Sequence, residues 1–144
     1  MKYLTEKQQK ILNVLSNDDS GNTLIMVQRW IGTSNAISHF CNINPRKSIL
    51  IIGFGQRRAD AMAKRLDDKS RLSTKDPELV IIDDITEFDP DKLDIIMREY
   101  IGKCRIVGIG AFSSNRSFSP PPEYQLQMTI AKCRQYGFNI TNQT

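Results

Sequence analysis

Short apolar runs alternate with helix-like patterns along the whole chain. The runs predict buried strands at residues 23–27, 49–52, 79–82 and 104–109, with a shorter one at 138–140. Between them, apolar residues recur at helical spacing over 4–15, 36–41, 57–66, 90–100 and 123–136. Thr5 and Gln8 also predict a capping box at the start of the first helix. This alternation is typical of a mainly parallel sheet covered on both faces, so we expect a three-layer α/β/α fold with four or five strands.

Length and composition narrow the class of protein. The chain has 144 residues, which predicts a single domain over residues 1–144, and its net charge of +4 permits contact with nucleic acid without requiring it. Its three cysteines lie far apart and His39 is its one histidine, so we expect reduced thiols and no zinc site. The N-terminus is polar and no apolar run reaches membrane-spanning length, so we expect a soluble, cytoplasmic protein without a membrane partner.

Two glycines, Gly53 and Gly55, separate the second apolar run from a helical pattern. One hypothesis is a Rossmann-type dinucleotide-binding turn, in which pyrophosphate sits on the helix N-terminus. That fingerprint needs a third glycine, but Arg58 occupies its position. It also needs an acid about 20 residues further on, and Asp83 lies farther away than that. The alternative is that the two glycines only permit a sharp turn between strand and helix.

A second hypothesis places a phosphate loop after the first apolar run. Such a loop presents backbone N–H groups and a helix dipole to the phosphates, while a lysine reaches the outer phosphates and a Ser or Thr hydroxyl binds Mg²⁺. The chain has Arg29-Trp30-Ile31-Gly32-Thr33-Ser34 at this place. An acidic pair after a later strand completes such a site, and Asp83-Asp84 follows the third run.

The order of these segments resembles the ATPase core of the helicase superfamily, and above all that of the large terminase subunits that package viral DNA. Residues 29–34 are similar to the terminase pattern R-x-x-G-K-[ST], with Thr33 in place of the lysine. Residues 44–57 resemble the segment after that loop, and residues 80–84 resemble the hydrophobic strand that ends in Asp-Glu. Residues 104–112 are similar to the later strand and coupling motif. The resemblance covers residues 4–112 and implies a P-loop NTPase-like fold.

The resemblance also implies ATP and Mg²⁺ as cofactors. The residues it implies are Arg29, Gly32, Thr33 and Ser34 for the phosphates, Ser34 and Asp83 for Mg²⁺, Asp84 for catalysis, and Gln8 or Gln9 for adenine. Since Thr33 replaces a lysine and Asp84 has a shorter reach than glutamate, we expect weak hydrolysis or none.

The implied partners are nucleic acid and other viral or assembly proteins, in the host cytoplasm if the protein is viral. Arg57 and Arg58, on the third predicted helix, are candidates for contact with nucleic acid or a partner. A different interpretation is an α/β binding module that has lost nucleotide binding. In that case Asp83-Asp84 is a solvated strand end, and Ser34 or Asn35 only caps a helix.

Overall fold

The computed structural model describes residues 4–28, 32–53, 56–112 and 122–142. Its strands are β1 (Thr23–Gln28), β2 (Ile49–Ile52), β3 (Leu79–Asp83), β4 (Arg105–Phe112) and β5 (Asn139–Asn142). Its α-helices are α1 (Glu6–Ser16), α2 (Thr33–Ile43), α3 (Gln56–Ala63), α4 (Pro90–Tyr100) and α5 (Pro122–Gln135). Three short 3₁₀ helices also occur, η1 (Asp18–Ser20), η2 (Lys69–Leu72) and η3 (Ile85–Glu87).

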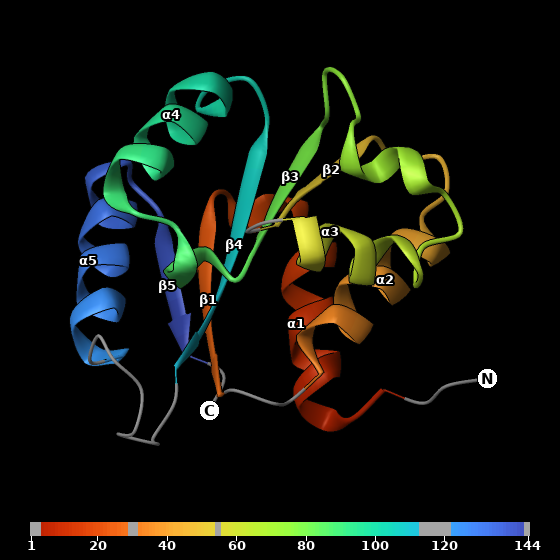
Figure 1. Cartoon of the computed structure of the whole chain (residues 1–144), viewed down its shortest axis with the longest axis horizontal. Coiled ribbons are helices and arrows are strands. Elements are labelled where there is room, and N and C mark those ends of the chain that lie inside the picture. The colour runs from red at the N-terminus through yellow and green to blue at the C-terminus, as the bar shows by residue number, and fades with distance from the viewer. Residues whose placement is uncertain (1–3, 29–31, 54–55, 113–121, 143–144) are drawn as a thin grey trace.

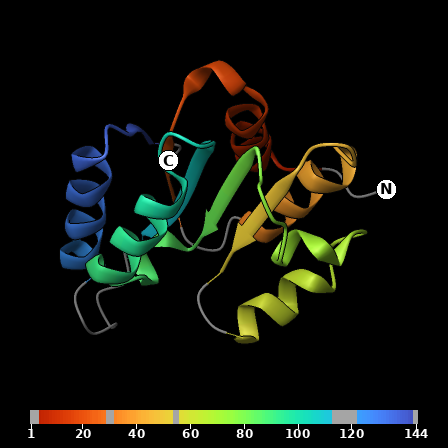
Figure 2. The same ribbon diagram turned by 90° about the horizontal axis from the view of Figure 1, so that it is seen from above.

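The strands form one sheet in the order β2-β3-β4-β1-β5, and every pairing between neighbours is parallel. Helices α1, α2 and α3 lie on one side of the sheet and α4 and α5 on the other (Figures 1 and 2). The three-layer α/β/α architecture predicted from the alternating pattern is therefore confirmed, with five strands.

Side-chain alternation along the strands builds a separate core on each face of the sheet. In β3, Leu79 and Ile81 pack with α1 and α2, whereas Val80 and Ile82 pack with α4. The other central strands alternate in the same way. Because both faces are covered, nearly every residue of such a strand is apolar, which is why the short runs were readable in the sequence.

Two glycines in β4 make room for the segment that follows β3. A Cβ atom on Gly108 would lie 2.6 Å from Cδ1 of Ile85, and one on Gly110 would lie 3.1 Å from Cγ2 of Thr86. Ile85 is fully buried. The short η3 helix therefore packs directly on β4 where β4 has no side chains.

Two predicted boundaries were wrong. Helix α3 ends at Ala63 rather than Leu66, and β4 continues to Phe112 rather than ending at Ile109. The charged segment 67–77 contains η2 and buries Arg71, which is only 4% exposed. The Arg71 guanidinium donates to carbonyl oxygens at the end of α2 and just beyond, those of Cys41, Asn44 and Lys47. A charged sequence pattern does not reveal such burial, because the partners lie far away along the chain.

Residues 113–121, between β4 and α5, lie outside the described residues. Within the part of the chain that the structure does describe, no helix is both long enough and apolar enough to cross a membrane.

The three thiols differ in burial, and this predicts their reactivity. Cys41 and Cys133 are buried, and burial raises the pKa of Cys41 to about 11 and that of Cys133 to about 12. Cys104 is half-buried, and burial raises its pKa too. Since only a thiolate attacks a disulfide reagent, we expect Ellman's reagent to modify Cys104 of the folded protein first, and Cys41 and Cys133 only as the protein unfolds.

Mass spectrometry of the modified peptides checks this order. The Cys104→Ser variant serves as the control and should leave the folded protein almost unreactive. Rapid modification of Cys41 in folded protein would contradict the burial seen in α2.

Candidate nucleotide site

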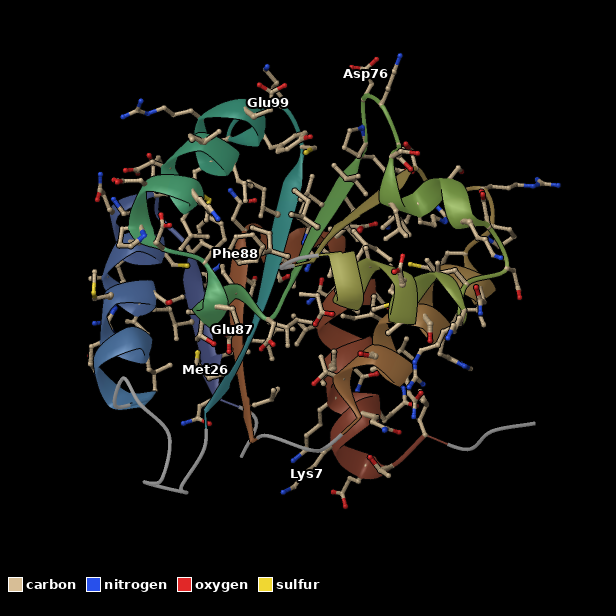
Figure 3. All side chains as sticks on the ribbon, viewed as in Figure 1. Lys7, Met26, Asp76, Glu87, Phe88 and Glu99 are labelled. Carbon is tan, nitrogen blue, oxygen red and sulfur yellow. The ribbon has the colours of Figure 1, made fainter. Side chains whose placement is uncertain are left out.

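The carboxyl ends of the five parallel strands all lie along one edge of the sheet, the edge that runs across the strand ends. Figure 3 shows Met26 and Glu87 toward this edge, and Asp76 and Glu99 at the opposite end of the molecule. At this edge β1 leads into α2 on one face, while its neighbour β4 leads toward α5 on the other face. Open α/β sheets bind ligands in the crevice where such connections diverge, so the ends of β1 and β4 are the place to look.

The N-terminus of α2 follows the carboxyl end of β1. Gly32 is its N-cap residue, with a left-handed φ of 82°, and no side chain of that residue caps the helix. Thr33 and Ser34 form the start of the first turn and are half-buried. Ser34 and Asn35 lie inside the helix, so the prediction that one of them is the N-cap was wrong. A helix start with a glycine cap leaves backbone N–H groups available for an anion.

Gln8 joins the first helix to this loop. Its Oε1 atom accepts a hydrogen bond from the backbone N–H of Thr5 at 2.9 Å, and the Thr5 hydroxyl oxygen accepts from the Gln8 N–H at 3.1 Å. This is the predicted capping box, which is therefore confirmed. Gln8 Nε2 then donates to the carbonyl oxygen of Gly32 at 3.2 Å. The buried Gln8 side chain thus positions the loop directly.

Gln9, the other glutamine predicted for adenine, points elsewhere. It is exposed, and its Nε2 donates to Oδ1 of Asn13 one turn further along α1, at 3.1 Å. Of the two candidates, only Gln8 is seen in contact with the loop before α2.

The acidic pair at the end of β3 is buried. Asp83 is 4% exposed and Asp84 is 7% exposed, so the interpretation of a solvated strand end was wrong. Asp84 adopts a left-handed conformation, with φ 57° and ψ 49°, at the start of η3. Asp and Asn tolerate this conformation better than most residues do. Its side chain makes no capping hydrogen bond to η3.

Strand register shows which way Asp83 faces. Asp83 pairs with Ile109 of β4, and Ile109 pairs with Ile25 of β1. Ile25 and Ile109 belong to the core beside α1 and α2, so alternation directs the Asp83 side chain to the face that carries α2. β1 continues to Gln28, about 10 Å of strand beyond this level. Asp83 therefore faces the side of the sheet that carries α2, at a level three residues before the end of β1.

The carboxylate of Asp83 and the hydroxyl of Ser34 could hold a metal ion only if a bound ligand supplied the remaining coordinating atoms. Among the described residues, no group of three or more His, Cys, Asp or Glu side chains could hold a metal ion by itself. Mg²⁺ bound with a nucleotide needs only one or two carboxylates, because phosphate oxygens and waters supply the rest. Asp83, with the hydroxyl of Ser34, is consistent with that arrangement.

Some predicted residues lie outside the described residues, namely Arg29 and its neighbours Trp30 and Ile31, together with Gly55. The backbone of α3 includes Arg57 and Arg58, but their side chains are not described. Gly53 follows β2, which is the outermost strand of the sheet and is separated from β1 by β3 and β4. The turn of the dinucleotide hypothesis is therefore far from the crevice at β1 and β4.

A pocket beside the loop was missed by the sequence analysis. Its volume is about 470 Å³, and it is lined by residues of α1, α2 and the end of α3. The lining residues are Leu4, Gln8, Asn35, Ser38, His39, Asn42, Lys64 and Arg65. A signal was present in the sequence, since the four α2 residues are polar and recur at helical spacing.

Comparison with known proteins identifies the fold. No protein-family model matches the chain, and no curated protein matches it. Among solved structures, Bacteroides sp. Pif1 in complex with ADP-AlF4 is similar, with a TM-score of 0.60 and 19% identity. That match covers 100% of this chain and 42% of the Pif1 chain.

A second Pif1 structure is also similar. It comes from a study of DNA unwinding at forked double-stranded DNA by two coordinating Pif1 helicases, with a TM-score of 0.57 and 16% identity. The match covers 100% of this chain and 44% of that chain. The chain has a helicase-type, P-loop NTPase-like α/β fold and spans less than half the length of the helicase chains it resembles.

Proposed function

We propose that the chain is an ATP-binding domain of a nucleic-acid machine. The phosphates bind at the backbone N–H groups of Gly32, Thr33 and Ser34, and Arg29 supplies positive charge. Ser34 and Asp83 hold Mg²⁺. Gln8 meets the adenine end of the nucleotide, with Gln9 as the weaker candidate because it bonds within α1.

The observation that carries this proposal is the placement of Asp83 relative to α2. A buried acid at the end of a central strand faces the same side as a helix whose N-cap offers no side-chain hydrogen bond. Mg²⁺ bound with a nucleotide needs only one or two carboxylates, one of which Asp83 would supply, and a helix N-terminus such as that of α2 favours the phosphates.

Hydrolysis by this site is slow or absent. Thr33 stands where a lysine would neutralise charge on the outer phosphates, and Asp84 has a shorter side chain than the glutamate that orients the attacking water. Asp84 has a left-handed backbone and immediately precedes η3. The first residue of η3, Ile85, is fully buried in the core. Asp84 therefore has little freedom to extend toward a distant water.

The machine is of helicase or viral terminase type, and its partners are nucleic acid and other assembly proteins. The helicase-type fold supports a role with nucleic acid, and the order of the motifs supports the terminase role. Arg57 and Arg58 lie on α3, which directly follows the carboxyl end of β2, and they provide the contact with nucleic acid or a partner.

Removing the Asp83 carboxylate is expected to abolish the Mg²⁺ dependence of nucleotide binding. With a fluorescent ATP analogue and Mg²⁺, we expect Asp83→Asn to weaken binding by about tenfold or more, equivalent to about 1.4 kcal/mol. Without Mg²⁺, the variant and the natural chain should bind alike. Asp76→Asn, which changes an exposed acid at the opposite edge of the sheet, is the matched control and should have no effect.

Arg29→Ala should weaken binding whether Mg²⁺ is present or absent. If the natural chain binds no ATP analogue, the proposal fails and the binding module without nucleotide is favoured. NAD binding that is insensitive to both variants would instead favour the dinucleotide hypothesis at Gly53.

A further inference from the structure

The pocket between α1, α2 and the end of α3 has a lining suited to an anion. Besides Leu4, every lining residue carries a hydrogen-bonding side chain, and none carries a carboxylate. Lys64 and Arg65, in the turn just after α3, contribute two basic side chains, and His39 contributes an imidazole from α2. The volume of about 470 Å³ lies within the usual range for small-molecule sites, about 300–1,000 Å³.

The two cations form no direct ion pair among the described residues. Within the described part of the chain, neither Lys64 nor Arg65 forms an ion pair with a carboxylate. The side-chain partner of Arg65 is the neutral Oδ1 atom of Asn35, which accepts a hydrogen bond from Nη1. Two adjacent cations that share a pocket with neutral amides leave a positive potential there, which a bound anion relieves.

Hydrogen bonds to α2 side chains position Arg65, one of the two cations. The Asn42 side chain donates from Nδ2 to the carbonyl oxygen of Arg65 at 3.1 Å, and its Oδ1 accepts from the N–H of Asp67 at 3.0 Å. With the bond from Arg65 to Asn35, two α2 side chains fix the chain just after α3. Such a pre-positioned site costs less entropy when a ligand binds.

We propose that this pocket binds the phosphate group of an organic phosphate. Lys64 and Arg65 pair with the phosphate oxygens, and guanidinium and amide N–H groups donate to them. Asn35, Ser38 and His39 line the rest of the pocket and bond to the organic part. The phosphate belongs either to a free phosphorylated small molecule or to the backbone of a single-stranded nucleic acid, since both present the same oxygens.

This site goes beyond the proposed function, because its two cations, Lys64 and Arg65, take no part in the proposed ATP site and it needs no metal ion. Gln8 is common to both sites, as its side chain lines the pocket and also bonds to the carbonyl oxygen of Gly32. The two sites are therefore distinguished by the residues they do not share, which are Lys64 and His39 for the pocket and Thr33 and Ser34 for the ATP site.

The test follows the NMR spectrum of the nitrogen-labelled full chain during titration without Mg²⁺. The probes are ribose phosphate, a thymidine hexanucleotide and, as a neutral control, ribose. We expect a phosphate-bearing probe to shift the signals of Asn35, His39 and Asn42, and ribose to leave them unchanged. A response to ribose phosphate identifies a small-molecule source, and a response to the hexanucleotide alone identifies a nucleic-acid backbone.

The Lys64→Gln variant removes one charge from an exposed side chain, so folding should be preserved. We expect it to weaken binding roughly fivefold at low salt, the effect of one exposed ion pair. Lys103→Gln, which removes an exposed lysine outside this pocket, is the matched control and should bind normally.

Four results would overturn the proposal. One is an equal response to ribose and ribose phosphate. Another is the lack of any shift with either phosphate probe at millimolar concentration, or a shift of the Thr33 and Ser34 signals only. The last is that Lys64→Gln binds the phosphate probe as tightly as the natural chain does. A response confined to Thr33 and Ser34 would support the phosphate loop while excluding the pocket, so the two proposals fail separately.

Discussion

Replacing Arg105 with alanine is expected to lower the free energy of unfolding by about 3 kcal/mol, because several acceptors lose a buried charged donor at once. The Arg105 side chain is only 9% exposed. Its guanidinium donates to the carbonyl oxygens of Val14 at 2.7 Å, Leu15 at 2.9 Å and Gly21 at 3.0 Å, and to the Ser20 hydroxyl oxygen at 2.6 Å.

These acceptors explain why the effect should be large. The last carbonyl groups of a helix lack the usual N–H partners four residues further on, and they carry the negative end of the helix dipole. The Val14 carbonyl also accepts from the backbone N–H of Asn17 at 3.2 Å. Arg105, at the first position of β4, satisfies them and fixes the turn that leads into β1. Alanine leaves the end of α1 and η1 without this connection to the sheet.

Urea unfolding followed by circular dichroism measures the loss. Arg105→Lys keeps the charge but cannot reach all four acceptors, so we expect an intermediate loss. Arg98→Ala, at an exposed position of α4, should change stability by no more than about 0.5 kcal/mol. A loss of less than about 1 kcal/mol for Arg105→Ala would show that the end of α1 is held mainly by its apolar contacts.

A methyl group on Gly32 is expected to damage both stability and the candidate nucleotide site. Gly32 has a φ of 82°, and an added Cβ would overlap Nε2 of Gln8. Gly32→Ala must therefore displace the Gln8 amide and break its hydrogen bond to the Gly32 carbonyl. We expect a loss of about 3 kcal/mol, combining backbone strain with the displaced buried amide.

The chain contains a matched control for the backbone strain alone. Gly102, just after the end of α4, has a φ of 79°, and a Cβ there would have nothing within 4 Å. Gly102→Ala should therefore cost only the left-handed strain, about 1 kcal/mol. The difference between the two variants measures the contact between Gln8 and the loop.

A double-mutant cycle provides the decisive measurement. With Gln8→Ala in the background, the methyl group on Gly32 has nothing to displace, so its cost should fall to that of Gly102→Ala. The same variants should be titrated with the ATP analogue, and we expect Gly32→Ala to bind it more weakly than Gly102→Ala. Equal costs for the two alanine variants would contradict the role given to Gln8.

Much of the candidate site followed from local patterns, but its arrangement did not. The acidic pair could be found because it ends an apolar run, and the loop because it precedes a helical pattern. Neither pattern reveals that Asp83 faces α2, since this depends on register across β4 to β1. The dinucleotide hypothesis at Gly53 was open for the same reason, because only the strand order shows that β2 is an edge strand.

The sequence by itself determined the layers and the elements, because a strand buried on both faces must be apolar at nearly every position, and because the cap of Thr5 and Gln8 is local. The tertiary structure decided what depends on partners distant along the chain. Arg71 and Arg105 look like surface charges in the sequence, yet each is buried on carbonyl groups from another segment. The same holds for the pocket at Lys64 and Arg65, which exists only because α3 ends beside α2. Hydrophobic patterning is a property of neighbours in sequence, whereas satisfying a buried charge requires groups that only folding brings together.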